Sequence, residues 1–224
     1  MTLAFDSFSL AASTADLDDE PEARAHADCL EFRMDLADEP LPALERYDGV
    51  LPILATNRAM WEGGEATDAG RLEALAEAAR FDAVEAVDVE LEAILEGDAD
   101  GVLEVADEVG VVVVASSHDF EGAPPRPELV RTLTEAGKYA DVAKLAVTAQ
   151  TTADTLALLS ATEQLTAHGD RVATMAMGEV GRHTRAVAPV YGSKIGYAPV
   201  DPANATAPGQ YDLETLAELV TNLE

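Results

Sequence analysis

Short apolar runs along the chain alternate with longer segments rich in Ala, Glu and Leu. This alternation is typical of parallel β-strands joined by crossover helices. The apolar runs predict eight strands, at residues 8–12, 29–36, 51–56, 86–91, 111–116, 141–147, 171–177 and 191–197. Helical patterns are clearest at 68–80, 127–137, 152–168 and 212–223. Eight strand–helix units in 224 residues favour an α/β fold of the (β/α)8 TIM-barrel class.

Loop signals indicate how the chain is divided. The Pro- and Gly-containing stretches 122–127 and 198–209 fit within the repeat as loops, so we expect a single domain over residues 1–224. A doubly wound open sheet is the alternative. That fold would bind a dinucleotide through Gly-x-Gly-x-x-Gly after the first strand, and no such motif occurs there.

Two predicted strands carry charged residues at alternate positions. Period-two geometry places Glu31, Arg33 and Asp35 on one face of their strand, and Asp88 and Glu90 on one face of theirs. On a half-exposed strand such a face is simply wet. In a barrel the apolar face meets the helices, so the charges point inward, where they must be paired. The pattern therefore predicts a polar network inside the barrel.

Lys144 interrupts the apolar run at 141–147 and is one of only three lysines among fourteen basic residues. Only a neutral amine attacks a carbonyl, and low-dielectric surroundings favour that form, so a lysine in this position is a candidate Schiff-base nucleophile. A lysine that snorkels near a strand end is the ordinary alternative. The strand by itself does not separate the two.

His118 follows the apolar run 111–116, at a strand end where barrel enzymes keep catalytic groups. Histidine exchanges a proton near neutral pH, whereas a lone histidine is more often structural. Its place one strand before Lys144 favours a role as general acid and base.

The formal net charge is -29. Nucleic acids are bound through clustered Lys and Arg, so this charge argues against a nucleic-acid partner and against an acidic membrane surface. So dense a carboxylate surface, with arginine preferred over lysine, is typical of proteins from salt-loving archaea. We expect a halophilic archaeal source.

Cys29 is the sole cysteine, so no intrachain disulfide forms and a reducing cytoplasm is the expected location. No basic leader region and no apolar run of about eighteen residues is present. These features predict a soluble cytoplasmic protein that is not a membrane partner.

Eight collinear motifs carry a specific resemblance. They are Glu31–Asp35, Arg58 with Glu62–Gly64, Val87–Leu91, Ser117–Phe120, Lys144–Ala146, Met175–Gly178 with Arg185, Tyr191–Ser193 and Ala207–Gln210. In this order the chain resembles the type I 3-dehydroquinate dehydratases, Schiff-base lyases of the shikimate pathway of aromatic amino-acid biosynthesis. The resemblance implies dehydration of 3-dehydroquinate to 3-dehydroshikimate, a carbon–oxygen lyase reaction, and suggests a homodimer.

The resemblance also implies a role for each matched residue. Lys144 forms the imine with the ring ketone, His118 is the general acid and base, and Glu62 is associated with His118. The remaining matches are substrate-binding positions, with Thr206 and Gln210 in a lid: Glu31, Arg33, Arg58, Arg185, Thr206 and Gln210. Trp61 stays open between a substrate contact and packing.

These roles agree with elementary chemistry, because a cationic imine accepts the electrons of the carbanion beside it. The sequence has no His/Cys cluster at metal-ligand spacing, so no metal and no cofactor is expected, and the partner is a small-molecule substrate. That substrate is an anion, so we expect Arg33, Arg58, Lys144 and Arg185 to supply a local excess of positive charge. Another class I Schiff-base aldolase on a TIM barrel is the alternative enzyme, and a barrel retained for protein interactions is the non-enzymatic one.

Overall fold

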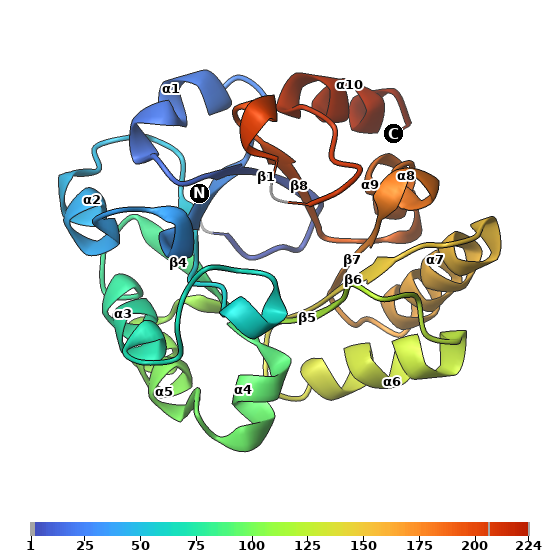
Figure 1. Ribbon diagram of the computed structural model, residues 1–224, viewed down its shortest axis with the longest axis horizontal. Helices are drawn as coiled ribbons and strands as arrows, with labels where there is room; N and C mark the ends of the chain where they lie inside the picture. The colour runs from blue at the N-terminus through green and yellow to red at the C-terminus, as the bar shows by residue number, and fades with distance from the viewer. Residues whose placement is uncertain (1–2, 206, 224) are drawn as a thin grey trace.

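The computed structural model describes residues 3–205 and 207–223, and its centre is one sheet of eight parallel strands. The strands lie in the order β7-β6-β5-β4-β3-β2-β1-β8. Figure 1 shows them as a central ring with the helices outside it. The predicted (β/α)8 barrel is confirmed. The strand bounds are β1 Ser9–Thr14, β2 Cys29–Arg33, β3 Ile53–Thr56, β4 Val84–Glu90, β5 Val112–Asp119, β6 Val142–Thr148, β7 Val172–Met177 and β8 Ile195–Pro199.

Helices connect successive strands and cover the outside of the ring (Figure 1). The α-helices are α1 Glu20–Ala23, α2 Pro40–Arg46, α3 Arg71–Ala78, α4 Leu91–Glu96, α5 Asp100–Val109, α6 Arg126–Ala136, α7 Thr152–Ala167, α8 Gly178–Gly181, α9 Thr184–Val187 and α10 Leu213–Leu223. Short 3-10 turns are η1 Leu17–Asp19, η2 Met34–Leu36, η3 Met60–Glu62, η4 Ala188–Tyr191 and η5 Pro202–Asn204. Within the described part of the chain, no helix is long and apolar enough to cross a membrane.

The two ends of the chain meet in the sheet. β1 pairs with β8 in parallel from Ser9↔Ile195 to Ser13↔Pro199. The ring closes between β7 and β8, where the Lys194 backbone N–H donates to the Val172 carbonyl at 2.8 Å.

The predicted strand bounds differ from the observed ones by up to four residues, and two of these differences change the interpretation. β8 begins at Ile195 instead of residue 191, because η4 and Gly192, with φ of 96°, precede it. β2 ends at Arg33, so the prediction that Asp35 shares a strand face with Glu31 is wrong. Asp35 lies in η2 and accepts two hydrogen bonds from the Arg33 guanidinium, at 2.9 and 2.7 Å. The 3-10 turn after β2 thus brings the Asp35 carboxylate back against the Arg33 guanidinium.

The apolar residues form two layers separated by the strands. On β4, Val87 and Val89 belong to the layer between sheet and helices, whereas Ala86 belongs to the apolar cluster inside the barrel. Alternation therefore turns Asp88 and Glu90 inward, above Ala86, and both are 1% exposed. The interior is apolar near the amino ends of the strands and charged toward their carboxyl ends.

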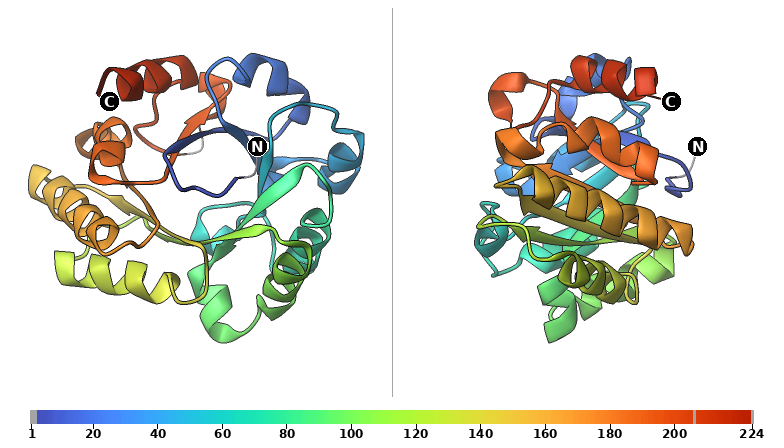
Figure 2. Two further views of the ribbon diagram at one scale, coloured as in Figure 1. Left: turned by 180° about the vertical axis from the view of Figure 1, so that it is seen from behind. Right: turned by 90° about the vertical axis from the view of Figure 1, so that its right-hand side faces the viewer.

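The segment before β1 crosses the amino-terminal end of the barrel (Figure 2). Leu3 and Phe5 are buried in the interior cluster, and the Leu3 N–H donates to Glu85 Oε2 at 2.6 Å. This segment covers the apolar end of the interior. The charged groups therefore lie at the carboxyl-terminal mouth, where barrels form their sites.

Candidate active site

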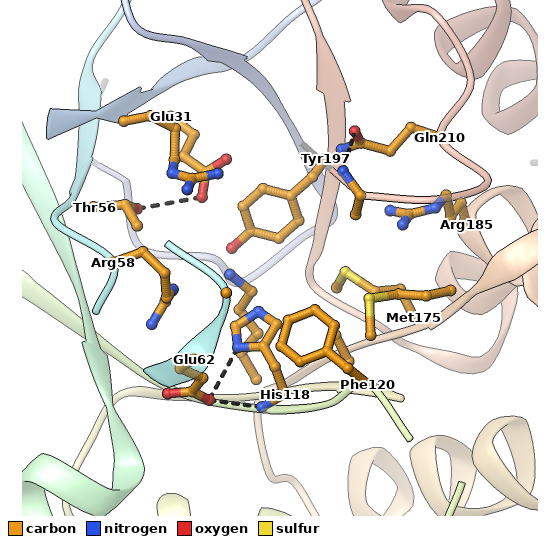
Figure 3. Close-up of a pocket in the computed structure, with 16 residues that line it drawn as sticks. Glu31, Thr56, Arg58, Glu62, His118, Phe120, Met175, Arg185, Tyr197 and Gln210 are labelled. Carbon is orange, nitrogen blue, oxygen red and sulfur yellow. Dashed lines mark hydrogen bonds and ion pairs between the residues drawn. The ribbon is translucent and has the colours of Figure 1, made fainter. Parts of the chain in front are cut away.

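A pocket at this mouth gathers the predicted site residues (Figure 3). Eight of the nine line it: Glu31, Arg33, Arg58, Glu62, His118, Lys144, Arg185 and Gln210. The ninth, Thr206, lies outside the described residues. Side chains that the motif match did not assign complete the wall, among them Thr56, Phe120, Met175 and Tyr197. Residues spread over the whole sequence thus meet in one place because the strands close into a ring.

Lys144 lies in the middle of β6 and is 4% exposed. Its Nζ lies 2.8 Å from Asp88 Oδ2 and 4.3 Å from the centre of the Tyr197 ring. A snorkelling lysine would extend to solvent, so this alternative is wrong. The amine instead lines the pocket, held between a carboxylate and an aromatic face.

Asp88 links this amine to Arg58. The Arg58 NH2 group donates to Asp88 Oδ1 at 2.6 Å, and the Ser116 hydroxyl donates to the same oxygen at 2.7 Å. Burial opposes ionisation of Asp88, but the Arg58 and Lys144 charges outweigh it and lower its pKa well below the usual range. Asp88 therefore stays ionised beside the Lys144 amine and the Arg58 guanidinium.

Glu90 extends the network away from the pocket. Its Oε1 accepts from Arg58 NH1 at 2.9 Å, and its Oε2 accepts from Arg71 NH1 at 2.6 Å. Arg71 also donates to the Asn57 carbonyl at 3.3 Å. The predicted interior polar network is confirmed for Asp88 and Glu90, and Arg71 is a member that the strand pattern missed because it belongs to α3.

His118 and Glu62 form a contact pair. Glu62 Oε1 accepts from the His118 backbone N–H at 2.7 Å and lies 3.0 Å from Nδ1 of the ring (Figure 3). Because Glu62 Oε1 already accepts a hydrogen bond from the backbone N–H, it can accept a second one from Nδ1, which places the ring proton on Nδ1. This tautomer leaves the Nε2 lone pair free to accept a proton.

Burial sets the charge states of this pair. It raises the pKa of Glu62 to about 7, with Arg58 opposing the shift and Glu90 adding to it. Burial also lowers the pKa of His118 well below 6.5, and the nearby charges of Arg58 and Lys144 lower it further. The imidazole is therefore neutral at pH 7 and able to act as a base.

We expect Glu62→Gln to remove a pH dependence of stability. Between about pH 4.5 and 7 the native Glu62 keeps a proton that the unfolded chain has lost, so the wild-type free energy of unfolding falls as the pH rises. A shift of this size corresponds to roughly 3 kcal/mol. Denaturant unfolding is measured at pH 5 and pH 8 in constant high salt. From pH 5 to pH 8, the free energy of unfolding of the variant should rise relative to that of the wild type by up to this amount.

The matched control is Glu135→Gln. Glu135 is partly exposed, and its hydrogen bond with Lys138 lowers the pKa of its carboxyl, so this variant should differ from wild type equally at pH 5 and pH 8. Parallel pH profiles for Glu62→Gln and wild type would contradict the protonated state assigned to Glu62.

Phe120 covers the His118 ring. The two rings stack with centroids 6.0 Å apart and planes 11° from parallel. Gly63 makes this possible, because a Cβ at that position would lie 2.5 Å from the Phe120 ring, and its φ of 81° also favours glycine. The Gly63 of the Glu62 loop thus lets an aromatic ring close over the histidine.

Glu31 and Arg33 occupy the opposite wall. Glu31 accepts hydrogen bonds from the hydroxyls of Ser13 and Thr56. Arg33 is held by the Asp35 carboxylate. Both side chains are fixed by neighbours of the adjoining strands and turn.

The local excess of positive charge predicted from the sequence is not what the pocket contains. Arg33, Arg58 and Lys144 each form an ion pair with a buried carboxylate. Among the described residues, Arg185 is 4% exposed and has no ion pair, and its Nε has no hydrogen-bond partner. Burial lowers the pKa of Arg185 to about 10, so the group is still cationic at neutral pH. Of the described cationic side chains that line the pocket, Arg185 alone has no ion pair.

Trp61, left open by the sequence, does not line this pocket. Its indole N–H donates to Asp68 at 2.9 Å, and Arg71 lies 5.9 Å from its ring centre. It is 46% exposed, and its contacts are with the loop before α3 and with the first residue of that helix. No group of three or more His, Cys, Asp or Glu side chains in the described ranges could hold a metal ion.

An eight-stranded parallel barrel with a lysine, a histidine and an arginine in its carboxyl-terminal pocket defines the class as a TIM-barrel enzyme. The family model for type I 3-dehydroquinase matches residues 9–224. The chain therefore belongs to the type I 3-dehydroquinase family, whose members are lyases.

Individual relatives agree with this assignment. The chain is 60% identical to 3-dehydroquinate dehydratase of Haloarcula marismortui, over 98% of each chain. It is 53% identical to that of Halobacterium salinarum, over 99% of this chain and 100% of the other. The crystal structure of 3-dehydroquinate dehydratase from Geobacillus kaustophilus HTA426 superposes with a TM-score of 0.85 at 30% identity, covering 97% and 91% of the two chains. The first two sources are halophilic archaea, in keeping with the acidic composition.

Proposed function

We propose that this chain dehydrates 3-dehydroquinate through a Schiff base on Lys144, with His118 as general acid and base. One observation carries the proposal: a buried amine, a neutral imidazole and an unpaired guanidinium line the same pocket. Nucleophile, base and anion anchor are the groups that elimination beside a ketone of a carboxylate substrate requires. Family membership favours this reaction over the aldolase alternative.

The proposed steps balance with one water lost. Lys144 Nζ adds to the ring ketone and releases water, which gives an imine. His118 Nε2 then removes a proton from C2, and the electrons move into the imine to give an enamine. The enamine expels the C1 hydroxyl, which leaves as water with the proton returned by His118. Hydrolysis of the conjugated imine consumes one water and frees 3-dehydroshikimate and the amine.

Asp88 contributes to the first and last steps in this proposal. Its carboxylate lies 2.8 Å from Nζ, so it orients the amine in the free enzyme. A protonated imine would keep a favourable contact with the same carboxylate. Arg58 and Ser116 hold Asp88 from the other side, which keeps its position fixed.

The remaining side chains bind and enclose substrate in this proposal. Arg185 holds the carboxylate, and Gln210 closes over it as part of the lid. Thr206 has the same proposed role, although it lies outside the described residues. Glu31 and Arg58, on the far wall, meet the ring hydroxyls. The support is their common position around one pocket (Figure 3).

Borohydride trapping tests the proposal. Reduction of the wild-type protein in the presence of 3-dehydroquinate should give an irreversible adduct on the peptide that contains Lys144, detected by mass spectrometry. The same treatment without 3-dehydroquinate should leave the peptide unmodified. Dehydration without any adduct on this peptide would exclude the Lys144 imine.

Arg185→Ala should raise KM by about 10- to 100-fold and change kcat less, because a hydrogen-bonded charge contributes about 1.5–3 kcal/mol. Steady-state kinetics provide the measurement. Arg182→Ala is the matched control, since this nearby guanidinium stacks 4.1 Å from the Tyr211 ring and does not line the pocket. Equal KM values for wild type and Arg185→Ala would assign the carboxylate to another group.

We also infer that residues 1–224 act as one domain, since β1 and β8, from opposite ends of the chain, pair with each other. A homodimer and a cytoplasmic location remain predictions. The buried free thiol of Cys29 is in keeping with a reducing compartment.

A further inference from the structure

Tyr197 is a pocket residue that the proposed mechanism does not use. It lies on β8, is 4% exposed, and its ring packs against Lys144 Nζ at 4.3 Å. Its buried hydroxyl has no hydrogen-bond partner among the described residues. Figure 3 shows the ring crossing the pocket, with the hydroxyl pointing into the space between Arg58 and His118.

The hydroxyl is not explained by the fold. A phenylalanine ring would fill the same volume and present the same aromatic face to Lys144. Burial of a hydroxyl without a hydrogen bond costs free energy that a phenyl ring does not. Burial raises the pKa of Tyr197 well above 10, with Asp88 and Glu31 adding to the shift, so the group stays a hydrogen-bond donor in the free enzyme. Its partner is therefore best sought in what enters the pocket.

The substrate orientation follows from two anchors of the proposed function. Arg185 holds the carboxylate on C1, and Lys144 bonds to C3. In a six-membered ring C4 is opposite C1 and next to C3, so the C4 hydroxyl is directed away from Arg185. Figure 3 places Arg185 on one side of the pocket and Glu31 and Arg58 on the other, which is the side toward which the Tyr197 hydroxyl points.

We propose that Tyr197 is a specificity-determining residue whose hydroxyl donates a hydrogen bond to the C4 hydroxyl of the bound substrate. The proposal rests on the proposed function, because it takes the orientation from the Lys144 imine. The phenol thereby selects ring ketones that carry a hydroxyl on the carbon beside the ketone. A site that hydrogen-bonds a substrate hydroxyl rejects analogues that lack it, since its own buried group is then left unpaired.

Tyr197→Phe tests this role because it removes only the oxygen. We expect kcat/KM for 3-dehydroquinate to fall about 3- to 10-fold, the size of one neutral hydrogen bond. The denaturation midpoint should stay unchanged or rise, because an unpaired buried group has been removed. A purely structural hydroxyl would give the reverse pattern, with a lower midpoint and unchanged kinetics, and this result would overturn the proposal.

An analogue that lacks the C4 hydroxyl makes the test specific. Wild type and Tyr197→Phe should process 4-deoxy-3-dehydroquinate with equal kcat/KM, since neither can form the hydrogen bond. If the variant loses as much on the analogue as on the natural substrate, the hydroxyl acts elsewhere and the proposal fails. Tyr47→Phe is the matched control: the Tyr47 hydroxyl donates to the Leu51 carbonyl at 2.7 Å, far from the pocket, so its loss should lower the midpoint and leave kcat/KM unchanged.

Borohydride trapping separates this proposal from the proposed function. Wild type and Tyr197→Phe should both give the adduct on the Lys144 peptide. If both give it and the two kcat/KM values are equal, only the role of Tyr197 is overturned. If wild type gives no adduct while it turns over substrate, the imine and the orientation built on it fall together.

Discussion

Lys144→Ala is expected to lower kcat by roughly 10⁴-fold or more and to abolish borohydride trapping with 3-dehydroquinate. Loss of a covalent nucleophile can cost on the order of 10⁶ in kcat, because the remaining groups then act on a reaction that lacks its intermediate. Here the lost intermediate is the imine, which accepts the electrons of the C2 carbanion. Initial-rate assays of 3-dehydroshikimate formation at saturating substrate measure the effect.

Folding must be separated from chemistry in this experiment. Lys144 is an ion-pair partner of Asp88, but Arg58 and Ser116 still bond to that carboxylate after the substitution. Lys144→Met fills the volume more closely than alanine and should be equally inactive. Both variants should keep the wild-type circular dichroism spectrum. Lys138→Ala, at an exposed lysine, is the control and should retain full activity. Residual dehydration above a few per cent in folded Lys144→Met would refute the imine route.

His118→Ala should lower kcat by about 10²- to 10⁴-fold, which is the usual contribution of a positioned general base. Unlike the lysine variants, it should still give the borohydride adduct on Lys144, because imine formation needs the amine and the ketone. Rapid quench with borohydride followed by mass spectrometry should show adduct accumulating while product forms slowly. His26→Ala, at an exposed histidine, should leave both measurements unchanged. Loss of adduct together with activity in His118→Ala would place the histidine in imine formation instead of proton transfer.

Much of the fold could be predicted because the sequence pattern and the barrel impose the same constraint. A parallel sheet with helices outside needs apolar residues on the outer face of each strand, so charges at alternate positions had to point inward, as Asp88 and Glu90 do. The position of β8 was missed by four residues. Tyr191 ends a 3-10 turn, and Gly192, Ser193 and Lys194 connect this turn to β8, so the strand starts only at Ile195.

The members of the site were predictable, but their pairing was not. Motif order identifies Arg33, Arg58 and Arg185 as site arginines, yet only the three-dimensional arrangement shows that the first two are neutralised by carboxylates. Asp35 joins Arg33 because a turn, not a strand, follows β2. Tyr197 also escaped the motif match, and period-two counting from Ile195, a residue of the barrel interior, could have found it.

The ion-paired chain from Lys144 through Asp88, Arg58 and Glu90 to Arg71 has a consequence for the medium in which this protein works. Mobile ions weaken the field of surface charges within a few ångströms at molar salt, but they do not enter a packed interior. The electrostatic interactions within this series of ion pairs therefore stay the same when the ionic strength of the solvent changes. Substitutions can therefore change the charge of the acidic surface to suit high salt, while the electrostatic potential at the reacting atoms stays constant. The barrel wall thus separates the electrostatics of the surface from those of the reacting atoms.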